Sequence, residues 1–236
     1  MRTSRYLAGA VAIIVSYALL FMLGPVATDM WVAEDQIAET VSALALLATG
    51  VFFLLILLNG RRDKRLGTLK QIILVGLVLL FLVAAGEEVS WGQRYFGVTT
   101  PSALQSRNAQ GELNLHNDKV FSGWLNSYRL MMLFWITFGV LIPVVAASSK
   151  RARAMLDRVI PVLPLWVAGY LIFATVVAKL SNVLASAFPH LYEGRYYPTY
   201  PGAATEITEA VIAVLLALGA YALYRRAKTA PKTSLP

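Results

Sequence analysis

The segment that decides the fold is residues 72–117, which read IILVGLVLLFLVAAGEEVSWGQRYFGVTTPSALQSRNAQGELNLHN. It begins with an uninterrupted apolar run, Ile72 to Ala85, and then changes into the densest group of hydrogen-bonding side chains in the chain. The change occurs at two adjacent carboxylates, Glu87 and Glu88. Charged groups at membrane depth are costly and commonly functional. We therefore interpret residues 86–117 as the functional centre and the remaining segments as a membrane scaffold that holds it.

The composition of the whole chain indicates a membrane protein. Of the 236 residues, 58% are hydrophobic and 14% are charged, whereas a soluble domain carries about 25% charged residues. The chain has no cysteine, which excludes disulfides, thiolate metal sites and cysteine nucleophiles. Its net charge of +8 does not indicate a nucleic-acid partner, because the sequence offers no basic domain to dock on a duplex.

The apolar runs predict an all-α, polytopic membrane helix bundle with about six transmembrane helices in one domain, residues 1–228. Each run is long enough to cross about 30 Å of hydrocarbon. A cleaved signal peptide is the alternative for the first run, but its apolar region is longer than usual and no clear cleavage motif follows it. The spans are expected near residues 7–23, 41–58, 71–91, 130–147, 162–187 and 205–224.

Two further segments complete this plan. Residues 87–128 are expected to form a long extracytoplasmic segment, built from short interfacial helices or from a re-entrant loop. Residues 229–236 are short and polar, and we expect them to be a disordered cytoplasmic tail.

Charge is divided unevenly between the two sides of the predicted bundle. The N-terminus, residues 59–70, residues 148–160 and the C-terminus carry 15 of the 21 Lys and Arg but 2 of the 13 Asp and Glu. Basic residues gather on the cytoplasmic side of a membrane. Both termini are therefore predicted to be cytoplasmic, in a multi-pass protein of the plasma (inner) membrane, and the polar segment faces outward.

Helix rise places ionisable groups of three predicted spans at one depth. Counted from the cytoplasmic ends of their spans, Glu87, Glu209 and Lys179 lie roughly 24 Å, 22 Å and 26 Å across the membrane. Buried charges should face the bundle interior and pair. Lys179 is expected to neutralise this layer, with snorkelling from its helix end as the alternative. The layer would contain Glu87, Glu88, Lys179, Glu206 and Glu209.

Acid–base residues are expected in the central segment. If residues 112–116 are helical, Glu112 and His116 are four residues apart and share a face, and if they are extended, Glu112, Asn114 and His116 share one. Either arrangement suits proton transfer. For Glu87 and Glu88, the alternative is that they lie in water where the third span leaves the membrane. For His116, the alternative is a structural loop histidine that bonds to its neighbours. The candidate catalytic residues are Glu87, Glu88, Glu112 and His116.

Substrate contacts are predicted from polar and aromatic residues on the outer side. Three arginines lie on this outer side, although basic residues favour the cytoplasmic side. Their guanidinium groups suit an anionic group of a substrate, and pairing with nearby acidic side chains is the alternative. Trp91 suits stacking on a sugar or base, and an interfacial aromatic belt is the alternative. The candidate substrate-binding residues are Trp91, Gln93, Arg94, Arg107, Asn114, Asn117, Lys179 and Arg195.

A divalent metal, zinc or manganese, is a further possibility, because these ions accept histidine and carboxylate ligands. No recognised spacing such as His-Glu-x-x-His supports it. For His190, in an aromatic loop, a structural role is the alternative. The candidate ligands are Glu88, His116, His190, Glu206 and Glu209.

The string Glu-Glu-Val-Ser-Trp-Gly-Gln-Arg at 87–94, with Asn-Leu-His-Asn at 114–117, resembles a string of bacterial multi-spanning proteins. The resemblance implies a bacterial membrane protein and does not indicate an activity.

Together these features predict an integral membrane enzyme with an outward-facing polar site at headgroup depth. The reaction would be hydrolysis or group transfer on an amphiphilic substrate, a lipid-linked phosphate or glycan, and the other partners would be membrane lipids. One alternative is a small ion- or proton-coupled transporter or channel that uses the glutamate–lysine layer. The other is a non-catalytic membrane assembly partner.

Overall fold

The computed structural model describes residues 2–22, 30–32, 36–64, 66–108, 111–115, 127–188 and 203–229. These described residues are 86% helical and include no β-strand, which confirms the predicted all-α class for this part of the chain. The longer helices, in chain order, are α1 (Arg2–Met22), α3 (Ile37–Arg62), α4 (Thr68–Glu88), α7 (Ser127–Trp135), α10 (Leu165–Ala187) and α12 (Ala203–Thr229). The shorter helical elements are η1 (Ser90–Gly92), α5 (Gln93–Phe96), α6 (Ser102–Gln105), η3 (Ile136–Leu141), α8 (Ile142–Ser148) and α9 (Lys150–Val159).

Five helices of the described chain are long and apolar enough to cross a membrane, which indicates a multi-pass membrane protein. They contain α3, α4, the continuous α7–η3–α8, α10 and α12. The apolar helical section within α1 is shorter, Tyr6–Leu19. The predicted first span therefore stays a prediction, and so does the count of six.

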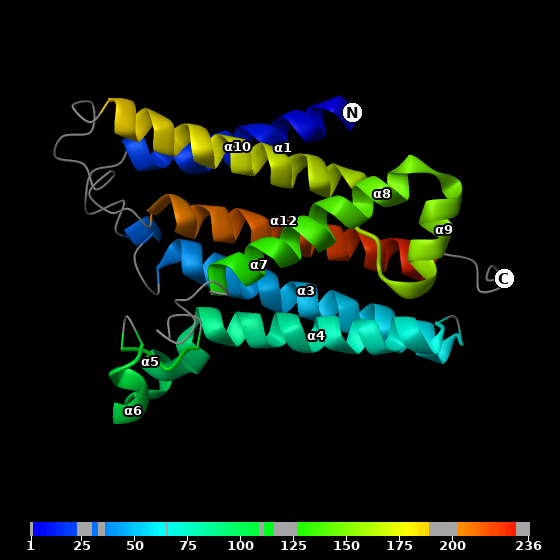
Figure 1. The fold of residues 1–236 in the computed structure, drawn as a ribbon, viewed down its shortest axis with the longest axis horizontal. Coiled ribbons are helices and arrows are strands. Elements are labelled where there is room, and N and C mark those ends of the chain that lie inside the picture. The colour runs from blue at the N-terminus through cyan, green and yellow to red at the C-terminus, as the bar shows by residue number, and fades with distance from the viewer. Residues whose placement is uncertain are drawn as a thin grey trace.

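The long helices run side by side, with α3 packed between α4 and α12 (Figure 1). Helix α10 packs on α12 and on α1, and the α7–η3–α8 helix crosses the bundle obliquely (Figure 1). Helix α4 ends at Glu88, three residues before the predicted end of the third span. Helix α10 begins at Leu165 rather than at residue 162, because Pro164 favours an extended residue before it and stands as the N-cap of the helix.

An apolar core joins these helices across the middle of the bundle. Phe53 of α3 is fully buried, and its ring centroid lies 5.8 Å from that of Phe81 in α4 and 6.0 Å from that of Phe138 in η3. Leu171 of α10 is also fully buried and lies so close to Gly139 that a Cβ there would be 2.5 Å from it. Close aromatic and aliphatic packing of this kind therefore holds the transmembrane helices in fixed positions.

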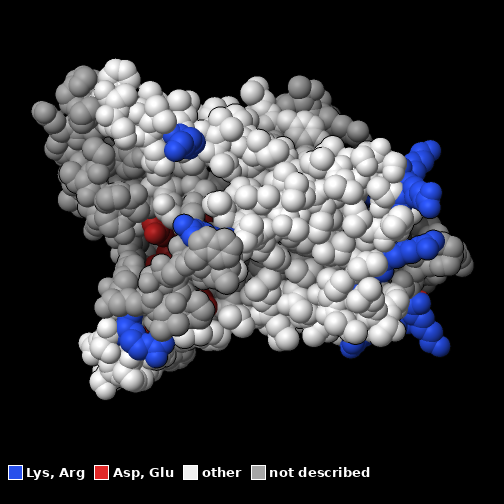
Figure 2. Space-filling model, in the orientation of Figure 1, with Lys and Arg blue, Asp and Glu red and all other residues white. Residues whose placement is uncertain are grey.

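Basic side chains gather at one end of the molecule (Figure 2). The end of α3, the start of α4, helix α9 and the end of α12 all lie at this end (Figure 1). The described basic residues of these elements are Arg61, Arg62, Lys70, Lys150, Arg151, Arg153, Arg158, Arg225, Arg226 and Lys228. The structure thus places at one end the loops that the charge count assigned to one side.

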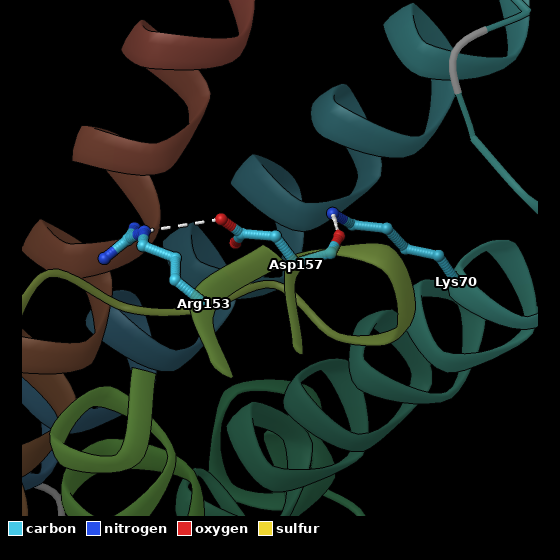
Figure 3. A network of polar contacts seen from close by, with 3 residues as sticks. All are labelled: Lys70, Arg153 and Asp157. Carbon is cyan, nitrogen blue, oxygen red and sulfur yellow. Dashed lines mark hydrogen bonds and ion pairs between the residues drawn. The ribbon is translucent and has the colours of Figure 1, made fainter. Parts of the chain in front are cut away.

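Helix α9 is fastened to this end by polar contacts. The Ser149 hydroxyl caps the helix by accepting a hydrogen bond of 3.0 Å from the Ala152 backbone nitrogen. The Lys70 ammonium, at the start of α4, donates to the backbone carbonyl of Asp157, whose carboxylate lies 3.4 Å from the Arg153 guanidinium (Figure 3). Asp157 therefore links the basic helix α9 to the bundle.

Candidate functional site

The last turn of α4 is followed by a left-handed turn that redirects the chain. Ser90, Trp91 and Gly92 have φ angles of 45°, 55° and 74°. Non-glycine residues adopt such angles at a cost, so surrounding contacts must hold the first two in place. The turn brings the Trp91 ring back onto Gly86, where an added Cβ would lie 2.9 Å from the ring. Glycine at position 86 is therefore what allows the tryptophan to fold against its own helix.

Glu87 connects this turn to a later part of the chain. One carboxylate oxygen accepts a hydrogen bond of 2.7 Å from the Trp91 indole nitrogen, and the other accepts one of 2.6 Å from the Leu115 backbone nitrogen. Hydrogen bonds to an ionised carboxylate are short and strong. Glu87 thus holds the central loop against the end of α4.

A buried polar network lies beside this contact, formed by Ser90, Asn108, Glu112 and Asn114. Each of these side chains is at most 7% exposed. The Glu112 carboxylate accepts hydrogen bonds of 2.9 Å from the Ser90 hydroxyl and 2.7 Å from the Asn114 amide. A buried carboxylate is tolerated when its oxygens are satisfied in this way.

The Asn108 amide closes the network by binding the loop backbone. Its nitrogen donates to the Asn114 backbone oxygen at 2.9 Å and to the Asn114 side-chain oxygen at 2.7 Å, while its oxygen accepts from the Glu112 backbone nitrogen at 3.2 Å. Gln93 adds a second tie, because its oxygen accepts from the Leu113 nitrogen and its nitrogen donates to the Thr100 hydroxyl, both at 2.6 Å. These bonds fix residues 111–115 in one conformation.

Carboxylates from three helices meet at the end of the bundle opposite the basic end. Glu209 of α12 lies close enough to Glu88 of α4, to Glu39 of α3 and to Glu206 for electrostatic repulsion. We call these residues, Glu39, Glu88, Glu206 and Glu209, the carboxylate cluster. Acidic side chains are visible at this end in a recess of the surface (Figure 2). The packing of α3 between α4 and α12 is what brings the carboxylates together.

Lys179 does not neutralise this cluster in the described part of the structure. Its side chain is exposed on α10, and it forms no ion pair with any residue that the structure describes. The expectation that a lysine balances the glutamate layer is therefore corrected. Its helix places it at the right depth, but α10 packs on α1 and α12 and turns this position outward.

Several predicted site residues are not placed by the structure. His116, Asn117, His190 and Arg195 lie outside the described residues, as does the side chain of Arg94. Arg107 is exposed on the central loop. Among the residues that are described, no group of three His, Asp or Glu side chains is arranged to hold a metal ion. A zinc or manganese site therefore stays a prediction that depends on the two histidines.

Three residues of the site were missed by the sequence analysis. Ser90 and Asn108 are buried members of the polar network, and Glu39 is a member of the carboxylate cluster. Their only sequence signal is position: the first two lie within the polar segment, and Glu39 lies just before the predicted start of an apolar span at residue 41.

A cavity of about 920 Å³ lies between α1, α3, α10 and α12. Its walls are mainly apolar, and they include Ala38 and Ile207, the sequence neighbours of Glu39 and Glu206. The cavity therefore begins at the level of the carboxylate cluster.

Compared with models of protein families, with curated proteins and with solved structures, the chain matches none of them.

The chemistry of the site follows from its two parts. The polar network and Glu87 have their hydrogen bonds directed at one another and at the backbone, so they serve to hold a rigid loop. In the carboxylate cluster acidic groups lie near one another in an apolar setting, which favours uptake of a proton. Groups that exchange protons are the ones that general acid–base catalysis requires.

Proposed function

We propose that the protein is an integral membrane enzyme that carries out hydrolysis or group transfer on an amphiphilic, lipid-linked substrate. The observation that supports this most is the convergence of Glu39, Glu88, Glu206 and Glu209 from three apolar helices at one end of the bundle. Such a group of carboxylates is costly in a membrane protein and is commonly retained for function.

We place the carboxylate cluster on the extracytoplasmic side of the plasma membrane. The basic residues gather at the opposite end of the bundle (Figure 2), and basic residues favour the cytoplasm. The C-terminal end of α12 lies at the same end as α9, and the N-terminal end of α1 points toward that end (Figure 1), so both termini are cytoplasmic in this proposal. The reaction then takes place at the depth of the outer lipid headgroups.

In the proposed mechanism Glu88 and Glu209 exchange a proton with the substrate or with the attacking water. We choose these two members of the cluster as the acid–base pair because they come from different helices, α4 and α12, and influence each other electrostatically. Glu87 and Glu112 act as positioning residues, since their carboxylates hold Leu115, Ser90 and Asn114. His116 follows directly on this fixed loop and is proposed as a proton carrier.

An ion-coupled transporter is less well supported. Below the cluster, α3, α4, η3 and α10 pack through Phe53, Phe81, Phe138 and Leu171, all at most 3% exposed. This apolar layer offers no polar path through α3, α4, η3 and α10, although the cavity beside α1 and α12 extends from Ala38 to Arg225. An enzyme needs access from one side only, whereas a transporter needs a route to both.

The test is turnover in vesicles that contain the purified full chain. A panel of labelled lipid-linked phosphates and glycosides is added to the outer leaflet, and products are separated by chromatography. We expect at least one substrate to be converted, and Glu88→Gln or Glu209→Gln to lower the rate by about 100-fold or more. Asp157→Asn, at the basic end, is the matched control and should turn over normally. Proton flux that depends on Glu209, without any turnover, would instead establish the transporter.

A further inference from the structure

Helix α9 lies across the basic end of the bundle. It packs against α8 and α4 and runs across the direction of the long helices (Figure 1). Since the long helices are the ones that are apolar enough to cross a membrane, an element across their ends lies along the membrane surface. The Lys70 ammonium holds α9 by donating to the Asp157 backbone carbonyl, and Ile160, directly after the helix, packs on the apolar core. The bundle therefore fixes the position of α9.

One face of α9 carries two arginines on either side of an apolar centre. Four exposed residues at positions i, i+3, i+4 and i+7 form this face, which we call the outer face of α9: Arg151, Ala154, Met155 and Arg158. Met155, a large apolar side chain, is 61% exposed. Basic residues around an apolar patch are typical of a helix that lies in the headgroup region of a membrane.

The arginines of the outer face have no partner in the part of the chain that the structure describes. Neither guanidinium forms an ion pair or a side-chain hydrogen bond there. Asp157, the acidic residue of α9, is already engaged by Arg153 at 3.4 Å. Lys150 adds a further exposed cation at the start of the helix. The outer face therefore presents positive charge that an anionic partner would neutralise.

We propose that the outer face of α9 binds anionic phospholipids of the adjacent leaflet. Met155 enters the boundary between headgroups and acyl chains, and Arg151 and Arg158 contact lipid phosphates on either side of it. Guanidinium groups bind phosphate oxygens through paired hydrogen bonds. An anionic lipid carries a net negative charge that a zwitterionic lipid lacks, so the outer face selects phosphatidylglycerol over phosphatidylcholine. This inference concerns the end of the bundle opposite the carboxylate cluster and does not depend on the proposed enzymatic function.

A lipid surface fits this face better than a soluble acidic partner does. The helix before α9 ends in a surface that faces lipid, because Val144 and Val145 of α8 are 47% and 50% exposed within an apolar span. Ser149 alone separates α8 from α9. The lipid-facing surface of the bundle therefore continues along the chain directly into α9, and headgroups reach the outer face without any rearrangement of the helices.

Competition between two lipids, read by native mass spectrometry, tests the proposal on the purified full chain. The protein in detergent receives equal amounts of phosphatidylglycerol and phosphatidylcholine, and the bound forms are counted by mass. We expect phosphatidylglycerol to be retained preferentially. Arg151→Gln/Arg158→Gln should lower this preference by about tenfold or more, since each basic residue near an anionic lipid surface contributes about fivefold in binding. Equal retention of the two lipids by the wild type would overturn the proposal.

Two further double variants separate the outer face of α9 from the total charge of this end. Arg62 and Lys228 are exposed at the same end but belong to α3 and α12. Arg62→Gln/Lys228→Gln removes the same charge and should lower the preference by no more than about twofold, because salt screens separated surface charges. Arg151→Lys/Arg158→Lys keeps the charge and should stay within about threefold of the wild type. Equal losses in the two glutamine variants would assign the selection to the total charge and contradict the role of α9.

The depth of Met155 in a bilayer is an independent test. The chain contains no cysteine, so Met155→Cys carries a single spin label. In vesicles of phosphatidylglycerol and phosphatidylcholine, we expect this label to collide more often with oxygen than with a water-soluble nickel complex. A label on Thr229→Cys, exposed at the end of α12, should show the opposite order. If the Met155→Cys label reported water, the proposal would be wrong and the outer face of α9 would be left to a soluble acidic partner.

Discussion

Glu87, on the last turn of α4, accepts a hydrogen bond of 2.6 Å from the backbone nitrogen of Leu115, 28 positions later in the chain. Its other oxygen accepts from the Trp91 indole at 2.7 Å. One carboxylate therefore closes a loop that includes η1, α5 and α6. The long polar segment is held to the membrane helices by a few charge-assisted contacts rather than by a large apolar core.

The first prediction is that Glu87→Ala releases this loop. Removing the acceptor leaves the exposed Leu115 N–H and Trp91 indole N–H to bond with water, which costs about 0.5–1.5 kcal/mol for each hydrogen bond lost. Hydrogen–deuterium exchange at Leu115 should become faster, and exchange in α3 and α12 should not. Glu87→Gln keeps one acceptor oxygen and should give an intermediate rate. Unchanged exchange at Leu115 in both variants would contradict the role assigned to Glu87.

The second prediction concerns the buried network. Glu112→Leu removes a carboxylate that is 7% exposed and leaves Ser90 and Asn114 with unpaired polar atoms. We expect a loss of stability of about 1–3 kcal/mol, since a buried donor left without its acceptor costs about that much, while Asn114 keeps its hydrogen bond of 3.1 Å to Ser90. The thermal midpoint in detergent measures it.

A double-mutant cycle with Ser90→Ala is the control for this network. Groups in one hydrogen-bonded network show coupling energies of about 0.5–3 kcal/mol. Strictly additive effects of Glu112→Leu and Ser90→Ala would mean that the two side chains do not stabilise each other.

These contacts show which parts of the molecule could be predicted from sequence. Helix class and approximate span positions follow from the length of the apolar runs, as at Ile72 to Ala85. The left-handed turn at Ser90 and Trp91 could not be predicted, because residues with side chains rarely adopt positive φ and local sequence favours continuing the helix. It depends on contacts with a loop about twenty residues away.

Part of the carboxylate cluster could also be predicted from the sequence. Glu88, Glu206 and Glu209 could be placed at one depth, because helix rise converts position along a span into depth. The contribution of Glu39 and the outward position of Lys179 depend on which helices are neighbours and how each is rotated. The spacing of residues in one sequence gives the depth of each residue along its helix, but it does not give the rotation of that helix against its neighbours.

The third prediction compares two glycines of α4. Gly86→Ala places a Cβ at 2.9 Å from the Trp91 ring, so we expect a loss of about 1–3 kcal/mol from overpacking. Gly76→Ala adds a Cβ that meets nothing within 4 Å and should stabilise the helix by up to about 1 kcal/mol. Thermal midpoints of the two variants, measured in the same detergent, should therefore move in opposite directions. A stable Gly86→Ala would show that the Trp91 ring is free to move away from the helix.

The last prediction separates function from stability within the carboxylate cluster. Glu209 lies in an apolar setting near Glu88, Glu206 and Glu39, so Glu209→Gln removes the cost of burying a carboxylate beside other acids while keeping the shape of the side chain. A gain of about 1 kcal/mol would raise the thermal midpoint by roughly 2–4 °C in a chain of this size. Turnover should be lost in the same variant, because a functional site commonly retains groups that cost stability. Glu112→Gln is the contrasting control. It replaces a carboxylate that accepts hydrogen bonds from Ser90 and Asn114, so it should lower the thermal midpoint. If Glu209→Gln also lowered the midpoint, Glu209 would be a structural residue like Glu112, and the proton-exchanging role would pass to another member of the cluster.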